Sequence, residues 1–184
     1  MDTLNQVQTQ TKWVSDPAHS ELTFKVRHLM ISNVKGEFTD FQVEMTSNGD
    51  DLTAAEVQVK INAGSVSTNN ADRDNHLKAE DFFDVANHPE LSFTSNAVQK
   101  VDDETYKVKG NLTIKGVSKE VVLDAEFGGY VTDPYGNEKA GFSISGKINR
   151  KEFGLNWNAA LETGGVMVGD EVKLNAEVQL VKQS

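Results

Sequence analysis

The histidines are the residues of this chain whose type could support metal binding. The four are His19, His28, His76 and His88. No two of them have the His-x-His or His-x-x-x-His spacing that places two imidazoles on one metal ion. The chain also has no cysteine, which leaves neither a thiolate site nor a disulfide. The sequence therefore predicts no metal site and no metal cofactor.

Asp16, His19 and Ser20 have the residue types of a Ser-His-Asp triad. Residues this close in sequence rarely reach triad geometry, and no nucleophile elbow or oxyanion glycine motif accompanies them. His19 stands in an Asp-Pro-x-His-Ser turn, where hydrogen bonds between side chains and backbone are the ordinary arrangement. The sequence predicts no catalytic residue and no enzyme. An alternative stays open, in which His28 or His19 is the acid or base of an enzyme that acts on a hydrophobic substrate.

Arg73 stands between Asp72 and Asp74. An ion pair on the surface of a helix would explain this arrangement. Alternatively, Arg73 could hold the anionic head group of a lipid, because a guanidinium group binds phosphate well.

The charge balance argues against two classes of partner. The 184 residues carry 18 basic and 28 acidic side chains, a formal net charge of -10. Nucleic acids and anionic membrane surfaces bind clustered Lys and Arg, so this balance disfavours both. No apolar run approaches a membrane span in length, and no stable membrane insertion is expected. The polar first residues lack the apolar segment of a signal peptide, which predicts a cytoplasmic protein, or a periplasmic or secreted one if a leader has been removed.

Rows of alternating apolar and polar residues define the elements that must position these groups. One row is Tyr106, Val108, Gly110, Leu112 and Ile114, with polar residues between them. Strict alternation is typical of antiparallel strands with one buried and one wet face. We expect strands at 12–15 with 20–28, 33–46, 54–66, 90–100, 104–114, 118–131, 139–149 and 170–181. The sequence thus predicts an all-β fold, an eight-stranded antiparallel barrel in one domain over 12–184, after a disordered polar lead-in at 1–11.

Two long connections interrupt these strands. The first, at about 67–89, changes period and predicts a short helical insertion near residues 70–85, since Asn70 can cap a helix and Pro89 lies beyond its end. The second, at 150–169, is unusually apolar, as lids and binding loops are. Barrels admit ligands at their ends. The residues expected to border an entrance are Phe82, Phe83, Leu155 and Trp157.

Small residues stand in the middle of several apolar rows, among them Gly110, Ala125, Gly146 and Ala176. A barrel of about eight strands just fills when its inward residues are bulky, so small ones leave room for a ligand. A glycine within a strand can instead mark a bulge or a bend, and both explanations stay open. The turn at 133–137 makes Ala125 and Gly146 approximate cross-strand neighbours, which together would widen the barrel.

The inward rows, the insertion and the apolar loop supply the candidate ligand-binding residues. They are Phe24, Val26, His28, Phe38, Val57, Val59, Phe82, Phe83, Phe93, Val108, Gly110, Leu123, Ala125, Ile144, Gly146, Trp157, Leu174 and Ala176. His28 would be a polar group at one end, and Trp157 either a ligand platform or ordinary packing. The predicted function is binding of a long apolar ligand. The alternative outside enzymology is a ligand-free barrel used for protein interaction.

Several segments, in order from about 12 to 182, resemble the YceI-like family of lipocalin-like polyisoprenoid-binding proteins. They are Asp16-Pro17-Ala18-His19-Ser20, Val34-Lys35-Gly36-Glu37-Phe38, Arg73-Asp74-Asn75-His76-Leu77 with Asp81-Phe82-Phe83, 110–116, and 150–157 with Phe153-Gly154. The resemblance implies an extended eight-stranded barrel around a long apolar ligand. It further implies storage or transport of an isoprenoid or fatty amphiphile, no established catalysis and no cofactor besides the bound lipid. It is compatible with a homodimer.

Overall fold

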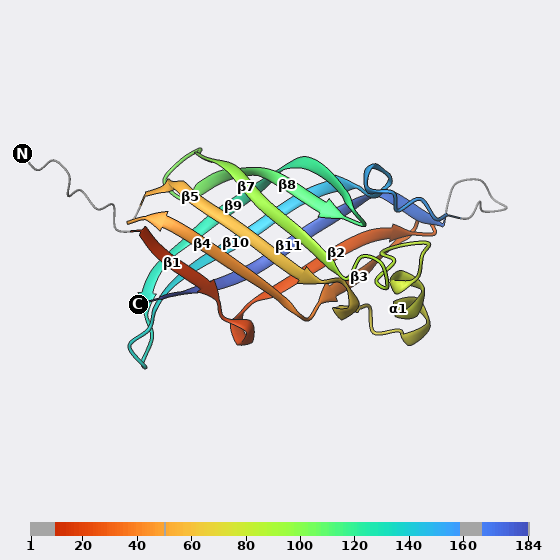
Figure 1. Cartoon of the computed structure of the whole chain (residues 1–184), viewed down its shortest axis with the longest axis horizontal. Helices are drawn as coiled ribbons and strands as arrows, with labels where there is room; N and C mark the ends of the chain where they lie inside the picture. Colours follow the sequence, from red (N-terminus) through yellow and green to blue (C-terminus); the bar gives the residue numbers. More distant parts are fainter. Residues whose placement is uncertain (1–9, 50, 159–166, 184) are drawn as a thin grey trace, which may run out of the picture.

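The structure is a computed structural model that describes residues 10–49, 51–158 and 167–183. Its strands are β1 (Gln10–Ser15), β2 (Glu21–His28), β3 (Ser32–Phe38), β4 (Phe41–Asn48), β5 (Asp51–Asn62), β6 (Val66–Ser67), β7 (Glu90–Lys100), β8 (Thr105–Ile114), β9 (Val117–Thr132), β10 (Glu138–Asn149) and β11 (Val168–Lys182). Eight of them form the antiparallel ring β1-β4-β5-β7-β8-β9-β10-β11, which a pairing of β1 with β11 closes (Figure 1). The predicted eight-stranded barrel is confirmed. The predicted lead-in lies outside the described residues as far as residue 9, and Gln10 and Thr11 begin β1.

The two ends of the barrel are completed differently. At one end, Leu180, Val181 and Lys182 of β11 pair with β1. Toward the other end β11 pairs with β2 instead, and β2 pairs with β3. The far edge of β3 pairs with a strand, within the described ranges, only at Glu37 and Phe38. The insertion with helix α1 (Ala71–Lys78) lies at this end (Figure 1), so a helical segment stands where a further strand would continue the wall.

Helix α1 begins and ends according to its local chemistry. The Asn70 side chain is the N-cap and accepts a hydrogen bond from the Arg73 N–H at 3.0 Å. Asp72 and Asp74 lie in the first turn, where carboxylates interact favourably with the helix dipole. After Lys78 the backbone N–H groups of 82–85 turn back to carbonyls of 77–79. The predicted insertion is confirmed, with a regular helix shorter than 70–85. None of the helices in the described part of the chain has the length and apolar character of a membrane span.

The prediction of one strand over 33–46 is wrong. Thr39 and Asp40 are exposed and separate β3 from β4. Phe38 and Phe41, on either side of this break, both face the barrel interior. Side chains alternate along a strand, so two residues an odd number apart face the same side only where the strand is interrupted. The break is therefore present in the apolar pattern itself.

A partly buried lysine, Lys139 of β10, ties the turn after β1 to the neighbouring strands. The Asp16 carboxylate accepts a hydrogen bond from Lys139 Nζ at 2.9 Å and contacts His19 Nδ1 at 2.9 Å. The Lys139 side chain is 13% exposed. The hydrogen bond from Lys139, followed by that to His19, lowers the pKa of Asp16 to about 2.

Replacing Asp16 with Asn should therefore lower the free energy of unfolding at pH 7 by about 1–2 kcal/mol. The pKa of this carboxyl is lower in the folded chain than in the unfolded chain, where it is about 3.9. Its stabilising contribution is thus complete above that value and is lost as the pH falls toward 2. Urea unfolding at several pH values should show wild type and Asp16→Asn converging near pH 2. Equal stability of the two proteins at pH 7 would contradict this assignment.

Candidate ligand cavity

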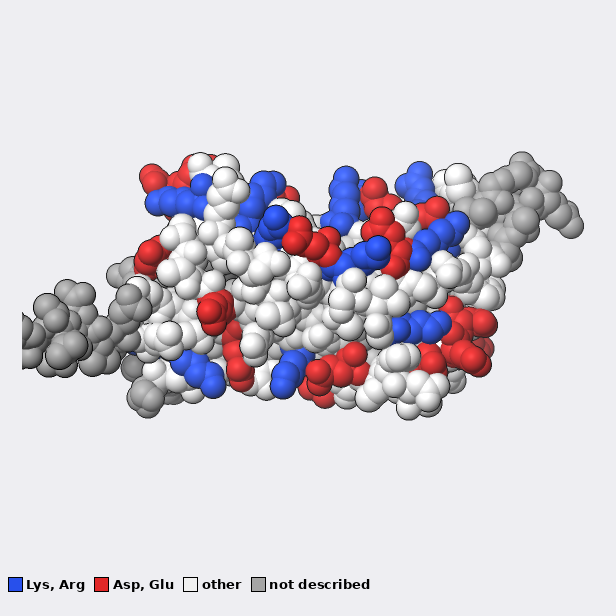
Figure 2. Space-filling model, turned by 45° about the horizontal axis from the view of Figure 1, so that its top comes forward, with Lys and Arg blue, Asp and Glu red and all other residues white. Residues whose placement is uncertain are grey.

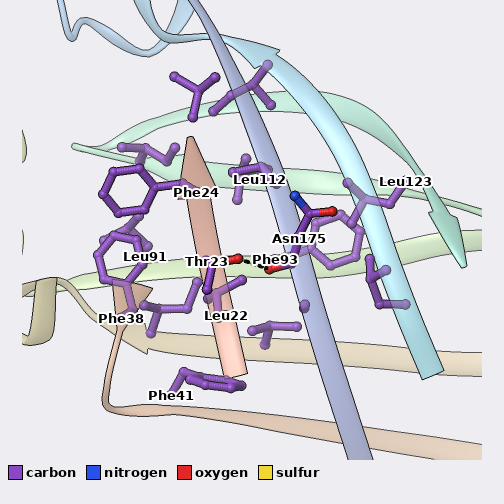
Figure 3. A pocket seen from close by; sticks show the side chains of 18 of the residues that line it. Leu22, Thr23, Phe24, Phe38, Phe41, Leu91, Phe93, Leu112, Leu123 and Asn175 are labelled. Carbon is purple, nitrogen blue, oxygen red and sulfur yellow. Dashed lines mark hydrogen bonds between the residues drawn. The ribbon is translucent and has the colours of Figure 1, made fainter. Parts of the chain in front are cut away.

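A cavity of about 630 Å³ lies inside the barrel. It extends from Met45 and Leu180, near the closure of β1 on β11, to Arg73 and Trp157 at the end that carries α1. Its wall consists almost entirely of apolar side chains, and Figure 3 shows several of them converging from different strands on the same space. Small-molecule and cofactor sites have volumes of about 300–1,000 Å³, so this space is large enough to hold a ligand.

The end at which β1 meets β11 is filled by side chains. Trp13 is 3% exposed and lies outside the cavity lining. Its Nε1 donates a hydrogen bond to Ser47 Oγ at 3.3 Å, and its ring packs against Tyr130 with centroids 5.6 Å apart. The accessible mouth is therefore at the opposite end, beside α1.

All predicted ligand-binding residues except Gly110 and Gly146 line the cavity. Those that do are Phe24, Val26, His28, Phe38, Val57, Val59, Phe82, Phe83, Phe93, Val108, Leu123, Ala125, Ile144, Trp157, Leu174 and Ala176. Their contact with a ligand stays a prediction. Further members of the same inward rows also line it, namely Leu22, Phe41, Leu91, Leu112 and Phe142. Continuing each alternating row to its end would have found all of them except Phe41, which lies beyond the break after β3.

Two of the glycines lie beneath a neighbouring side chain instead of opening space. A Cβ atom at Gly146 would lie 2.5 Å from Cδ2 of Leu123. At Gly36 it would lie 2.3 Å from Cζ of Phe24. Large side chains from the next strand thus occupy the space that each glycine leaves. The widening predicted at Gly146 is therefore wrong.

Gly110 supports the bulge explanation. A Cβ atom there would lie 2.4 Å from the carbonyl oxygen of Thr94 and 2.8 Å from Cα of Ser95, both backbone atoms of β7. The register of β7 against β8 shifts between Ser95 and Ala97, which marks a bulge at this point. A glycine is needed because the bulged backbone approaches β8 closely.

The predicted pairing of Ala125 with Gly146 is also wrong, since Ala125 pairs with Ile144. Close to the turn the two strands pair symmetrically about the middle of 133–137, and Gly129 lies opposite Gly141. The register then shifts next to Gly141, where β9 holds an extra residue. Gly129 has a φ of 110°, a conformation that favours glycine. This bulge displaces every pair beyond it.

Arg150 organises the loop at the mouth from a buried position. Its side chain is 3% exposed. Nε donates a hydrogen bond to the Gly169 carbonyl at 2.8 Å, and Nη2 donates one to the Val168 carbonyl at 3.2 Å. Nη1 donates to the carbonyls of Leu155 and Trp157. One guanidinium group thus joins the segments 155–157 and 168–169.

The environment of Arg150 perturbs its ionisation. Burial lowers the pKa of the guanidinium group, and Asp170, whose carboxylate is 3.9 Å away, raises it. Sequence reasoning gave Arg150 no role. The sequence does hold a signal that Arg150 faces inward. It stands two residues after Ile148 and so continues the inward row of β10.

Aromatic rings connect the mouth loop to the helical insertion. The ring centroid of Trp157 lies 4.7 Å from that of His76 and 5.6 Å from that of Phe82. Phe83 packs against Phe38 of β3 at 5.6 Å. The described parts of the two long connections therefore meet at one end of the cavity, as expected. Residues 159–166 of the predicted loop lie outside the described residues.

Arg73 does not form the ion pair suggested by its acidic neighbours. Its Nε donates to Thr68 Oγ1 and its Nη2 to the Thr68 carbonyl, both at 2.8 Å. Asp74 accepts hydrogen bonds from the N–H and hydroxyl of Thr68 instead. Among the described carboxylates, none lies within ion-pair distance of Arg73. Arg73 thus lines the mouth as a cation held in place by a threonine.

The other polar candidates do not assemble a catalytic site. His19 contacts Asp16, but the Ser20 hydroxyl donates to the Gln179 carbonyl at 3.4 Å, so no Ser-His-Asp arrangement forms. His28 lines the cavity, and no described residue gives its ring a hydrogen bond or an ion pair. Over the described ranges, no group of three or more His, Cys, Asp and Glu residues could hold a metal ion.

Comparisons with known proteins agree with this architecture. A UPF0312 protein of Staphylococcus epidermidis is 41% identical over 170 residues, which make up 92% of this chain and 96% of that protein. Among solved structures, BcnA of Burkholderia cenocepacia is similar with a TM-score of 0.78 at 21% identity, over 90% of this chain and 98% of that chain. A polyisoprenoid-binding domain from Saccharophagus degradans is similar with a TM-score of 0.65 at 15% identity, over 94% and 98% of the two chains.

The family comparison covers nearly the whole barrel. The model of the YceI-like domain matches residues 13–180, from Trp13 in β1 to Leu180 in β11. The matched range thus holds the helical insertion, the cavity wall and the Ser15–Leu180 pair of the ring closure. The chain belongs to the YceI-like family.

Proposed function

We propose that the protein binds a long-chain apolar ligand inside the barrel, as a store or carrier of a polyisoprenoid or related amphiphile. The observation that carries the proposal is the cavity of about 630 Å³ with its nearly unbroken apolar wall. Burial of an apolar chain there would contribute about 25 cal/mol per Å², before the costs of ordering the ligand. The S. degradans domain, which is described as binding a polyisoprenoid, agrees with this ligand class.

The polar groups at the mouth suit an amphiphile better than a hydrocarbon. Arg73 is held by Thr68 and lines the cavity end, where His28, Asn70 and Asp72 also lie. A guanidinium group without a carboxylate partner can donate hydrogen bonds to an anionic head group and bind it well. The tail would then lie among the apolar rows, with the head group at α1.

The surroundings of His28 favour a carrier over an enzyme. A catalytic histidine is normally oriented by a second polar group. The described residues provide no such partner for His28. We therefore propose no catalysis and no cofactor besides the bound lipid. A cytoplasmic or periplasmic location and a homodimer remain predictions.

Organic extraction of the purified protein followed by mass spectrometry tests the proposal. Wild type should release a long-chain lipid in a stoichiometric amount, or should take up an added long-chain prenol. A protein that is empty and takes up neither a prenol nor a fatty alcohol would contradict the proposal.

Ala176→Phe should remove the retained lipid. Ala176 lines the cavity wall, where it is partly exposed to the open space, so the added ring enters that space with little overpacking. We expect the unfolding midpoint to change little while the extracted lipid falls at least about tenfold. Ala54→Phe is the matched control, because Ala54 is exposed on the outer face of β5. Full retention by a folded Ala176→Phe would argue against a ligand beside this residue.

A further inference from the structure

A row of lysines crosses the outer face of the barrel on neighbouring strands. Its members are direct cross-strand neighbours in the order Lys147 on β10, Lys173 on β11, Lys25 on β2 and Lys35 on β3. Within the described residues, Lys25, Lys35 and Lys173 have no ion-pair partner. Lys147 has only Glu171, at 4.0 Å. We call this set the lysine row.

The lysine row differs from the rest of the outer face. Figure 2 shows basic and acidic side chains interleaved over much of one face. Several other lysines on the outer face form ion pairs with acids, as Lys109 does with Glu120 at 3.4 Å and Lys182 with Glu138 at 3.0 Å. Like charges directly opposite each other on a sheet are destabilising. The row therefore lowers stability in a chain that has an excess of acids.

Protection of a sheet edge does not explain the row. Lysine is common on edge strands because its charge prevents pairing with another chain. Lys35 stands on β3, whose far edge is largely unpaired. Lys25, Lys173 and Lys147 stand on strands that are paired on both sides. A function for the row must therefore lie outside the sheet.

An exposed apolar tip lies at the end of the same hairpin. Leu29, Met30 and Ile31 connect β2 to β3 and are 37%, 52% and 79% exposed. Leu29 and Met30 have φ values of 53° and 66°, a left-handed conformation that disfavours such side chains. The Leu29 N–H donates to the carbonyl of Met167, which lines the cavity. The hairpin tip, 29–31, thus projects into solvent at the cavity mouth.

We propose that the lysine row and the hairpin tip bind the surface of a membrane that contains anionic lipids, with the cavity mouth facing the bilayer. Lys25 and Lys35 lie about 10–13 Å from the tip along the strands. Amphipathic elements enter the membrane interface by about 5–10 Å, which places these lysines level with the lipid phosphates when the tip enters.

This contact is peripheral and reversible, unlike membrane insertion. The net charge of -10 disfavours an anionic membrane surface as a partner only where basic residues are scattered. The strand register instead places four lysines side by side on one face. Docking goes beyond the proposed function, because it does not require a loaded cavity. Lipid extraction and vesicle binding can therefore fail independently.

Flotation with vesicles tests the docking surface in wild-type protein. Vesicles of phosphatidylcholine mixed with phosphatidylglycerol should retain the protein, and vesicles of phosphatidylcholine alone should retain much less. Retention should fall as salt is raised, since the Debye length shortens from about 10 Å at 0.1 M to about 3 Å at 1 M. Equal retention by both kinds of vesicle, or by neither, would overturn the proposal.

The combined variant Lys25→Gln, Lys35→Gln and Lys173→Gln should weaken binding to anionic vesicles about tenfold or more. Relief of repulsion should also raise its melting temperature by about 1–3 °C, which shows that it folds. The matched control is Lys12→Gln, Lys100→Gln and Lys182→Gln, which removes the same charge from exposed lysines toward the opposite end. Equal losses of vesicle binding in the two variants would refute the role of the lysine row in docking.

Ile31→Ser should weaken vesicle binding about fivefold to tenfold, because the exposed isoleucine no longer enters the interface. Its control is Tyr135→Ser in the turn between β9 and β10, where Tyr135 is 89% exposed. If Ile31→Ser binds vesicles as well as wild type does, the hairpin tip has no part in docking.

Binding to single-stranded DNA is a separate test of the lysine row. Stronger retention of the protein on single-stranded DNA than on anionic vesicles would assign the row to nucleic acid and overturn the membrane proposal.

Discussion

Replacing Arg150 with methionine should lower the free energy of unfolding by about 3–5 kcal/mol. The substitution leaves the carbonyl groups of Leu155, Trp157, Val168 and Gly169 without the donors that Arg150 supplies. Because the guanidinium group is 3% exposed, water cannot replace these hydrogen bonds without opening the loop. Urea unfolding followed by circular dichroism measures the loss. Tryptophan fluorescence should report a wetter Trp157 in the folded variant.

Lys151→Met is the matched control for this variant. It removes the same charge from the next residue, whose side chain is 47% exposed and pairs with Asp170 at 3.4 Å. Exposed ion pairs contribute about 0–1 kcal/mol, so a small effect is expected. Similar destabilisation by both substitutions would mean that charge, and not the four carbonyl bonds, makes Arg150 important.

Gly110→Ala should destabilise the fold by about 2–4 kcal/mol. The new Cβ atom would lie 2.4 Å from the Thr94 carbonyl oxygen, so the bulged backbone of β7 must move. Chemical denaturation should show an earlier midpoint with an unchanged slope. The fluorescence of bound lipid analogues is a second readout, because β7 and β8 both form the cavity wall.

Gly141→Ala provides the comparison for Gly110. Gly141 also lies within a strand, but nothing lies within 4 Å of the position of its Cβ atom. There, alanine should be neutral, or stabilising by about 0.4–1 kcal/mol, because it restricts the unfolded chain. Gly146→Ala should fall between the two, since the side chain of Leu123 can rotate away. A Gly110→Ala protein as stable as Gly141→Ala would contradict the close approach of β7.

The sequence predicted the barrel because strand alternation is a local property. Each row, such as Tyr106 to Ile114, reports which face of its own strand is buried. The break at Thr39 was missed, although Phe38 and Phe41 fall on opposite phases of the alternation. Where apolar rows change phase, a bend or a bulge is the physical consequence.

The residues that line the cavity were predicted better than the structural roles of its glycines. Nearly all the predicted lining residues face the interior, since facing follows from alternation. The role of Gly110 depends on a bulge in another strand, and the role of Gly146 depends on the register of β9. Register and bulges are set by long-range packing, which one strand's sequence does not contain. The network of Arg150 was hidden for the same reason, because its acceptors are backbone carbonyls.

The closure of β1 on β11 has a consequence for how this protein is made. On the side away from β4, Trp13, Val14 and Ser15 pair with Lys182, Val181 and Leu180. Contacts so far apart in sequence form slowly and raise the contact order. During synthesis the ring cannot close until Leu180 to Lys182 have left the ribosome, and until then its apolar inner face is open to water or to chaperones. The proposed ligand would be enclosed only after that last pairing, so its loading would follow translation.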